Sequence, residues 1–228
     1  MSNNGEGILT GNMQIFMLRH GQPKFPDSRP YVYGQTDYPL SEKGLEQARR
    51  MGAALSGIPM RRIISSDLSR AARTAEIVAE MQAEKICKPE RDPELREMNM
   101  GEWDGRLAED VNVDFADIYG KKGRDIVTAA PPGGESFSDL RERGVTAFDR
   151  IIDESSDLGR ILIVAHANLI WSIVSRVFGI PLGSVFSFAH AYCGLHVLER
   201  RKEASDWGLY RLVRYNWLPN PDDQADRP

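Results

Sequence analysis

Two short apolar runs that each end on a histidine constrain the fold of this chain most strongly. The first run, Ile15–Leu18, leads into Arg-His-Gly, and the second, Ile161–Val164, leads into Ala-His-Ala. In an open α/β sheet, ligands bind at the carboxyl ends of the strands. The arginine, histidine and glycine around His20 suit an anion, because they supply a fixed cation, a nucleophile and close approach of the backbone. The pattern predicts that His20 and His166 lie at a site for a phosphate monoester.

Apolar residues at helical spacing alternate with short apolar runs along most of the chain. Strands are expected at 13–19, 62–65, 161–164, 195–198 and 209–213, and helices at 45–55, 68–78, 140–151 and 169–177. Ser41 is expected to cap the first helix. Residues 22–39, rich in proline, glycine and tyrosine, are expected to form a long loop. The alternation predicts an α/β fold with three layers, α/β/α, in which helices cover both faces of a mainly parallel sheet.

The chain of 228 residues has the length of one domain, which we place at residues 13–218. Polar tails at 1–12 and 219–228 are expected to be disordered. Residues 98–136 break the alternation of strands and helices. A long irregular insertion of this kind is often a lid or a specificity element.

Composition and charge argue against several classes of protein. A net charge of −4 and a pI near 5.7 indicate no basic surface for nucleic acid. The longest apolar segment, 161–174, is too short to span a bilayer, and the first residues lack the features of a signal peptide. Cys87 and Cys193 lie far apart in the sequence, which favours a reducing compartment. We therefore expect a cytoplasmic protein without a nucleic-acid or membrane partner.

Phosphoryl transfer needs fixed positive charge around the phosphate, a nucleophile, and an acid for the leaving oxygen. His20 follows Arg19 directly and is the best nucleophile, since no serine or cysteine stands in a recognisable nucleophile motif. Arg70 is expected in the first turn of a helix, where a guanidinium and helix amides converge on phosphate oxygens. His166 is a further candidate cation, and Glu97, in the irregular segment, is the candidate acid.

These candidates lie within six motifs that occur in a specific order. The motifs are Leu18-Arg19-His20-Gly21, Pro39-Leu40-Ser41-Glu42-Lys43-Gly44, Ser65-Ser66-Asp67-Leu68-Ser69-Arg70-Ala71 with Thr74-Ala75, Leu95-Arg96-Glu97 with Gly101, Pro132-Gly133-Gly134-Glu135-Ser136, and Val164-Ala165-His166. Over about residues 13–215 the chain resembles the histidine phosphatase superfamily, in the branch that contains cofactor-dependent phosphoglycerate mutases and their phosphatase relatives. The resemblance implies a phosphoglycerate mutase-like fold.

The resemblance also implies a role for each candidate residue. His20 would be phosphorylated in line, while Arg19, Arg70 and His166 would clamp the transferring phosphoryl group. Glu97 would protonate the leaving alcohol and then deprotonate the water that cleaves phosphohistidine. No metal and no cofactor is implied. The two arginines would also keep the His20 imidazole neutral, and a bound phosphate dianion would keep Glu97 protonated.

The chain departs from the family pattern at three places. Relatives often carry an asparagine six residues after the nucleophile, where this chain has Pro26 with Asp27 or Ser28 as the nearest polar alternative. Ala167 stands where relatives usually have glycine, so the amide is kept but the backbone is restricted. Gln-Pro-Lys replaces the usual acidic and small hydroxyl residues after the first motif, and Lys24 could supply replacement positive charge.

Two segments, 22–36 and 98–136, are expected to line the leaving-group side and to decide the substrate. The expected substrate-binding residues are Arg19, Arg70, His166, Ala167, Gln35 and Lys24. The expected partner is a small phosphorylated molecule that the sequence does not identify further. The oligomeric state is left open, a homodimer included.

The leading hypothesis is a metal-independent phosphomonoesterase of the histidine acid phosphatase type that works through phosphohistidine on His20. A cofactor-dependent phosphoglycerate mutase is the first alternative, and it requires extra cations and a covering insertion. The cations after the candidate acid are Arg106, Lys121, Lys122, Arg124 and Arg141. The second alternative is a weakly active phosphate-binding module, which only Pro26 and Ala167 favour. A metal site is disfavoured, because two arginines would repel a cation. His190 and His196 are interpreted as structural or surface histidines.

Overall fold

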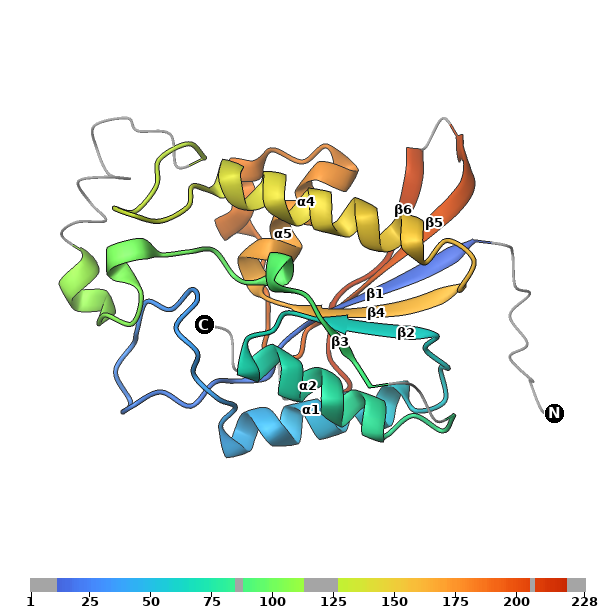
Figure 1. The fold of residues 1–228 in the computed structure, drawn as a ribbon, viewed down its shortest axis with the longest axis horizontal. Helices are drawn as coiled ribbons and strands as arrows, with labels where there is room; N and C mark the ends of the chain where they lie inside the picture. Colours follow the sequence, from blue (N-terminus) through green and yellow to red (C-terminus); the bar gives the residue numbers. More distant parts are fainter. Residues whose placement is uncertain (1–11, 85–87, 113–126, 206–207, 221–228) are drawn as a thin grey trace.

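The structure of the protein is a computed structural model that describes residues 12–84, 88–112, 127–205 and 208–220. Strands of these residues form one sheet in the order β3-β2-β4-β1-β5-β6 (Figure 1). Their bounds are β1 Met13–Arg19, β2 Arg62–Ser65, β3 Glu90–Arg91, β4 Arg160–Ala165, β5 Leu195–Ser205 and β6 Gly208–Trp217. The first four strands pair in parallel, and β5 pairs antiparallel with both β1 and β6. The predicted mainly parallel sheet is confirmed.

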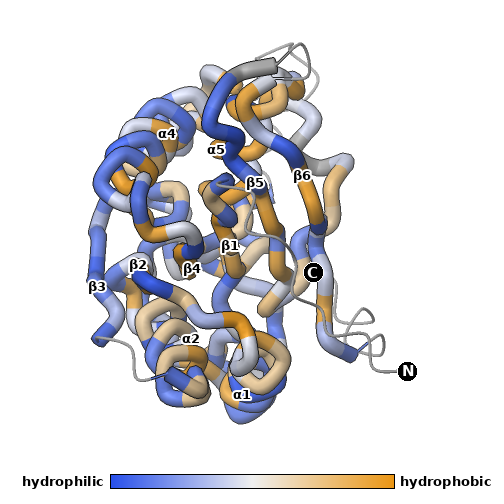
Figure 2. Tube along the Cα trace, turned by 90° about the vertical axis from the view of Figure 1, so that its right-hand side faces the viewer, coloured by the Kyte–Doolittle hydropathy of each residue, from blue (hydrophilic) through white to orange (hydrophobic). Residues whose placement is uncertain are grey.

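Four long helices of the described residues lie in two layers around this sheet. Figure 1 shows α4 (Phe137–Glu154) and α5 (Ala167–Phe178) on one side, and α1 (Glu42–Leu55) and α2 (Ser69–Glu80) on the other. The residues of β1 divide accordingly: Ile15 and Met17 belong to the core under α4 and α5, whereas Phe16 and Leu18 belong to the core over α1 and α2. Figure 2 shows apolar residues concentrated along these central strands. The three-layer α/β/α architecture is confirmed.

Local sequence signals account for the helix ends. Ser41 caps α1, since its hydroxyl accepts a hydrogen bond from the Gly44 N–H at 3.0 Å, as its position in the sequence predicts. Ser136 and Asp139 form a reciprocal capping box at the start of α4. Gly179 ends α5 in the left-handed conformation, with a φ of 66°.

The last two strands extend beyond the predicted ranges 195–198 and 209–213. Leu195, Val197 and Leu198 are buried, but β5 continues through the charged residues 199–203, several of which are partly or fully exposed. Backbone hydrogen bonds to β6 carry this part of the hairpin, so apolar periodicity underestimates its length. The two-residue strand β3 was not predicted either, because both of its side chains are charged and exposed.

Residues 22–39 are irregular, as predicted, and so is much of the described part of 98–136, although 108–112 are helical. Short 3₁₀ helices cover Pro93–Leu95, Gly101–Trp103 and Leu182–Ser187. Of the predicted insertion 98–136, residues 113–126 lie outside the described residues, and so do 1–11 and 221–228 of the predicted tails. Asn12, the end of the first predicted tail, donates a hydrogen bond to Glu199 at 3.0 Å. Within the described ranges, no helix is both long and apolar enough to cross a membrane.

Candidate active site

The sheet brings the two strand-end histidines together. Strands β1 and β4 are parallel neighbours with Arg19 opposite Ala165, so the next residue of each, His20 and His166, emerges at the same edge. Their ring centroids lie 5.0 Å apart, and both side chains are buried. Sequence periodicity predicted each strand end separately, and the β1–β4 pairing makes one site of them.

The hydrogen bonding of His20 leaves one ring nitrogen for chemistry. Its Nδ1 lies 2.7 Å from the carbonyl oxygen of Gly21. Because a carbonyl only accepts, Nδ1 carries the proton and Nε2 holds the lone pair. The adjoining backbone is tightly packed: a Cβ on Gly21 would lie 2.5 Å from the Gly44 carbonyl oxygen, so only glycine fits there. The neutral His20 imidazole thereby has a defined tautomer, with its lone pair on Nε2.

The electrostatic surroundings also favour neutral imidazoles. Burial, and then the charges of Arg70 and Arg19, hold the pKa of His20 well below its usual value. Burial and the charge of Arg70 lower the pKa of His166 in the same way. Both ring nitrogens of His166 are buried and have no hydrogen-bond partner among the described residues. A buried polar atom of this kind costs free energy unless a ligand bonds to it, so His166 is suited to meet a phosphate oxygen.

Arg70 is held rigidly by the loop that follows β1. It lies in the first turn of α2, is fully buried, and donates from Nη1 to the Thr36 carbonyl at 2.8 Å and from Nη2 to the Gly34 carbonyl at 2.6 Å. Its Nε is buried without a partner in the described part of the chain. Fixed geometry with spare donors is what a guanidinium needs to clamp an anion.

Arg19 is fixed in a similar manner at the end of β1. Its Nη1 donates to the His190 carbonyl, its Nη2 donates to the Tyr33 hydroxyl at 3.3 Å, and its buried Nε has no partner in the described ranges. The guanidinium carbon lies 4.0 Å from the ring centroid of Tyr192, a cation–π contact. Arg19 and Arg70 therefore bring two fixed positive charges to the histidine pair.

Glu97 is buried at the same site. One carboxylate oxygen accepts from the Met98 N–H at 2.8 Å, and the other accepts from the Asn168 N–H at 3.2 Å, in the first turn of α5. Burial raises the pKa of Glu97 despite these two hydrogen bonds and the nearby positive charges of Arg70 and Arg19. A raised pKa favours the protonated carboxyl, which is the form that can donate a proton to a leaving oxygen.

Two further side chains hold the backbone of Glu97. The Gln35 amide donates to the Glu97 carbonyl at 3.1 Å, so this predicted substrate-binding residue lies beside the candidate acid. Arg143 donates to the same carbonyl at 3.3 Å and pairs with Glu135 at 2.9 Å. Arg143 was not predicted as a site residue, although Glu135 lies in a motif that the sequence singles out.

Two tyrosines at the site were also not predicted. The hydroxyls of Tyr33 and Tyr192 lie 2.8 Å apart, and the ring of Tyr192 lies 5.8 Å from that of His20. Burial raises the pKa of Tyr192, so its hydroxyl stays protonated. The number of tyrosines in the 22–39 loop was a visible signal for Tyr33, whereas Tyr192 stands in no motif.

Some predicted residues are exposed or lie beside the histidine pair. Lys24 is exposed, and Asp27, a suggested replacement for the missing asparagine, instead pairs with Arg29 at 2.7 Å on the surface. Ala167 is the first residue of α5, which starts without a side-chain cap, so its amide belongs to the helix end next to His166. Asp27 is thus engaged by Arg29 and does not replace the asparagine that relatives carry.

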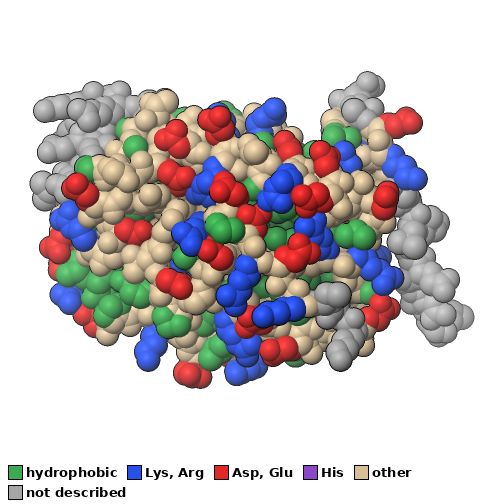
Figure 3. All heavy atoms as spheres, in the orientation of Figure 1, with side chains coloured by type: hydrophobic (Ala, Val, Ile, Leu, Met, Phe, Trp, Pro, Cys, Tyr) green, Lys and Arg blue, Asp and Glu red, His purple; other side chains and the backbone are tan. Residues whose placement is uncertain are grey.

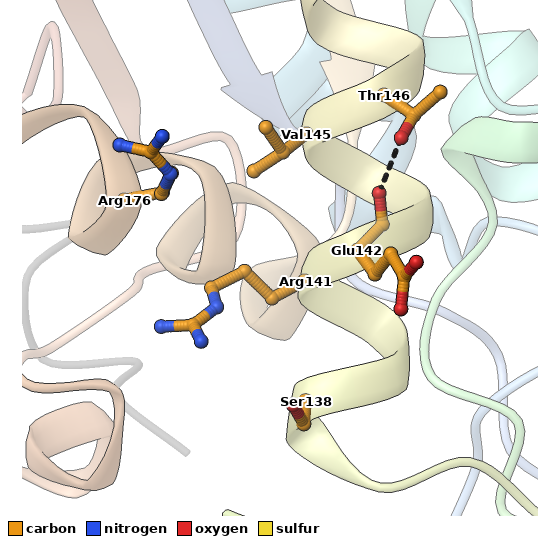
Figure 4. Close-up of a pocket in the computed structure, with 6 residues that line it drawn as sticks. All are labelled: Ser138, Arg141, Glu142, Val145, Thr146 and Arg176. Carbon is orange, nitrogen blue, oxygen red and sulfur yellow. Dashed lines mark hydrogen bonds between the residues drawn. The ribbon is translucent and has the colours of Figure 1, made fainter.

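Arg141, one cation considered for the mutase alternative, lies in a surface hollow instead. Figure 4 shows Arg141 extending from α4 and Arg176 from α5 around this hollow of about 280 Å³. Residues two positions apart on a helix point in different directions, and Arg143 is the one that reaches Glu97. Lys121, Lys122 and Arg124 lie outside the described residues.

The other two histidines are also buried, and the backbone carbonyl of His190 is the one that accepts from Arg19. The rings of His190 and His196 lie 5.2 Å apart and pack against Tyr215. Burial lowers the pKa of His190 to about 4 and that of His196 to about 3, so both are neutral at neutral pH. Among the described residues, no group of three or more histidine, cysteine, aspartate or glutamate side chains could hold a metal ion.

Comparisons with known proteins agree with this geometry. A probable phosphoglycerate mutase from Erwinia tasmaniensis is 30% identical over 203 residues, covering 86% of this chain and 90% of the relative. The adenosylcobalamin/alpha-ribazole phosphatase of Salmonella typhimurium is 32% identical over 178 residues, covering 77% of this chain and 85% of the relative.

Solved structures of phosphatases are also similar to this chain. A putative alpha-ribazole-5'-P phosphatase from Escherichia coli matches with a TM-score of 0.77 at 25% identity, over 90% of this chain and 96% of that one. A mycobacterial glucosyl-3-phosphoglycerate phosphatase matches with a TM-score of 0.74 at 25% identity, over 90% and 99% of the two chains. The model of branch 1 of the histidine phosphatase superfamily matches residues 15–213, and the chain therefore belongs to that family.

Proposed function

We propose that this protein is a metal-independent phosphomonoesterase that hydrolyses a small phosphate ester through a phosphohistidine on His20. The observation that carries the proposal is the buried pair of neutral imidazoles with two fixed guanidinium groups at one sheet edge. Similarity to phosphatases of the same family supports hydrolysis as the reaction class. The specific enzyme type, histidine acid phosphatase, stays a prediction.

In the first step the lone pair on Nε2 of His20 attacks phosphorus, and the bond from phosphorus to the leaving oxygen breaks. The Glu97 carboxyl gives its proton to that oxygen, so a neutral alcohol departs and a carboxylate remains. Arg19, Arg70 and His166 hold the three equatorial oxygens, over which the transition-state charge is spread. The Nδ1–H bond to the Gly21 carbonyl keeps the attacking tautomer in place throughout.

In the second step water attacks the phosphorus of phosphohistidine. The Glu97 carboxylate takes a proton from that water, the bond between phosphorus and Nε2 breaks, and the electron pair returns to His20. Inorganic phosphate leaves and the carboxyl of Glu97 is again protonated, so the cycle is complete. The burial of Glu97 supports this exchange, because a raised pKa lets one group act as acid and then as base near neutral pH.

The main alternative is phosphoglycerate mutase activity, which the names of several similar proteins suggest. A mutase returns the phosphoryl group to the substrate instead of to water, and it must hold the substrate carboxylate with additional cations. Arg141 does not serve that purpose, since it lies in the hollow between α4 and α5 (Figure 4). The position of Arg141 therefore supports the phosphatase over the mutase.

The test compares phosphate release from p-nitrophenyl phosphate with conversion of 3-phosphoglycerate to 2-phosphoglycerate, each with and without EDTA. We expect chelator-insensitive phosphate release that His20→Ala abolishes. Arg70→Lys should lower kcat/KM about 10²–10³-fold, the loss typical of one preorganised charge-stabilising donor. Arg73→Lys is the matched control, because Arg73 lies on the same helix but is exposed and paired with Glu76 and Glu80.

Conversion of 3-phosphoglycerate to 2-phosphoglycerate with little free phosphate would contradict the phosphatase proposal and indicate a mutase. Phosphate binding without turnover of either compound would contradict both enzyme hypotheses and indicate a weakly active phosphate-binding module. The cytoplasmic location, the lack of nucleic-acid and membrane partners and the oligomeric state stay predictions.

A further inference from the structure

Four aromatic side chains gather in the loop between β1 and α1. Phe25 is the centre: its ring centroid lies 5.0 Å from that of Tyr33, 5.5 Å from that of Tyr38 and 6.0 Å from that of Tyr31. All four side chains of this aromatic cluster are partly exposed. Figure 3 shows hydrophobic side chains gathered at the same side of the molecule where Figure 1 places this loop. Aromatic rings that keep exposed surface are available for contact with a ligand.

The aromatic cluster is continuous with the anion site. The Tyr33 hydroxyl accepts from Arg19 at 3.3 Å, and the guanidinium carbon of Arg70 lies 5.3 Å from the Tyr33 ring centroid. Tyr33 thus contacts both guanidinium groups and Phe25. The aromatic cluster therefore borders the two guanidinium groups that would hold a phosphate.

The loop that carries the cluster is held in a fixed conformation. The N–H of Val32 donates to the Arg106 carbonyl at 2.8 Å, and the Val32 carbonyl accepts from the Gly105 N–H at 2.9 Å. Arg70 holds the carbonyls of Gly34 and Thr36. A rigid aromatic surface loses little conformational entropy on binding, and preorganisation of this kind favours affinity.

We propose that the aromatic cluster binds an aromatic ring on the leaving alcohol, so that the substrate class is a phosphate ester of a ring-bearing alcohol. This inference rests on the proposed function and specifies its substrate. Ring faces and edges suit stacking with another ring.

The test compares kcat/KM for benzyl phosphate and cyclohexylmethyl phosphate. The two leaving alcohols are similar in size and reactivity, and only benzyl alcohol carries an aromatic ring. We expect the wild-type protein to prefer benzyl phosphate about three- to tenfold, the effect of one aromatic contact. Phe25→Leu keeps an apolar side chain but removes the central ring, and it should bring the ratio close to one.

Two other variants complete the design. Tyr38→Leu removes a ring from the edge of the cluster and should reduce the preference even where Phe25→Leu fails to fold. Tyr210→Leu is the matched control, since Tyr210 packs on Phe148 on the other side of the sheet and should leave the ratio unchanged. A wild-type ratio near one, or a ratio that the cluster variants do not change, would overturn this inference alone. Hydrolysis of neither ester, with p-nitrophenyl phosphate also untouched, would overturn the proposed function and this inference with it.

Discussion

Asp104 joins the irregular insertion to the loop that holds Arg70, and its replacement provides a sharp test of the site's construction. Its carboxylate accepts from three consecutive backbone N–H groups, Gly34 at 3.0 Å, Gln35 at 2.7 Å and Thr36 at 3.2 Å. It also accepts from the Thr36 hydroxyl at 2.6 Å. Two of these three residues supply the carbonyls that fix Arg70, and the third holds Glu97.

The variant Asp104→Asn keeps the shape of the side chain but replaces one acceptor oxygen by an NH₂ donor. In either orientation of the amide, at least one backbone N–H of the loop then faces another donor and loses its partner. An unsatisfied donor costs about 1–3 kcal/mol, and the remaining hydrogen bonds lose the assistance of the charge. We expect the free energy of unfolding to fall by about 3 kcal/mol, and kcat/KM to fall about 10- to 100-fold as Arg70 shifts.

The measurement combines urea-induced unfolding, followed by tryptophan fluorescence, with kcat/KM for p-nitrophenyl phosphate on the same preparations. Asp27→Asn is the matched control, because Asp27 is an exposed carboxylate of the same loop that pairs with Arg29. This control should change stability by no more than about 0.5 kcal/mol and leave turnover unchanged. Equal behaviour of the two variants in both assays would refute the idea that Asp104 positions the site.

Three other predictions follow from burial and packing. Glu97→Gln should lower kcat/KM for an alkyl phosphate about 10²–10⁴-fold but lower kcat/KM for p-nitrophenyl phosphate much less, because kcat/KM reports the steps up to departure of the leaving group and p-nitrophenolate needs no proton; equal losses of kcat/KM on both would contradict the acid role. Burial lowers the pKa of His190 to about 4 and of His196 to about 3, so each takes up a proton on unfolding below about pH 6.5. Unfolding free energy should therefore fall as the pH drops from about 6.5 toward 4, by about 1.4 kcal/mol per pH unit for each histidine, and urea titrations that show rising stability on acidification would contradict this. Gly44→Ala should lower the melting temperature despite the helix preference of alanine, because the added Cβ would lie 2.1 Å from the Gln22 carbonyl oxygen. Gly57→Ala serves as the control, since its Cβ would meet no atom within 4 Å.

The parts of the site that lie next to a strand end in the sequence could be predicted. His20 and His166 each follow an apolar run, and the parallel pairing of those runs is what an α/β alternation requires. Arg70 was placed correctly in the first turn of a helix that follows β2. In these cases covalent connection to a regular element determines the position of the side chain, so a pattern in one segment is sufficient.

The loop after β1 shows where this reasoning ends. Its irregularity was predicted, but Lys24 and Asp27 turned out to be exposed, and the residue that contacts Arg19 is Tyr33. No periodicity specifies which side of an irregular segment faces the site. The decisive contacts come from elsewhere in the chain, in this case from Asp104 in the insertion.

Arg143 shows the deeper reason why a second layer of residues escapes prediction. Its guanidinium bonds the backbone carbonyls of Glu94, Arg96 and Glu97, at 2.7, 3.1 and 3.3 Å. A carbonyl is the same on every residue, so no pattern of side chains at these positions can reveal an arginine that binds them. Only Glu135, which pairs with Arg143 through its side chain, leaves a trace in the sequence. Residues that act on backbone are therefore found from structure, and Arg143 can be replaced only by a side chain that reaches the same three oxygens.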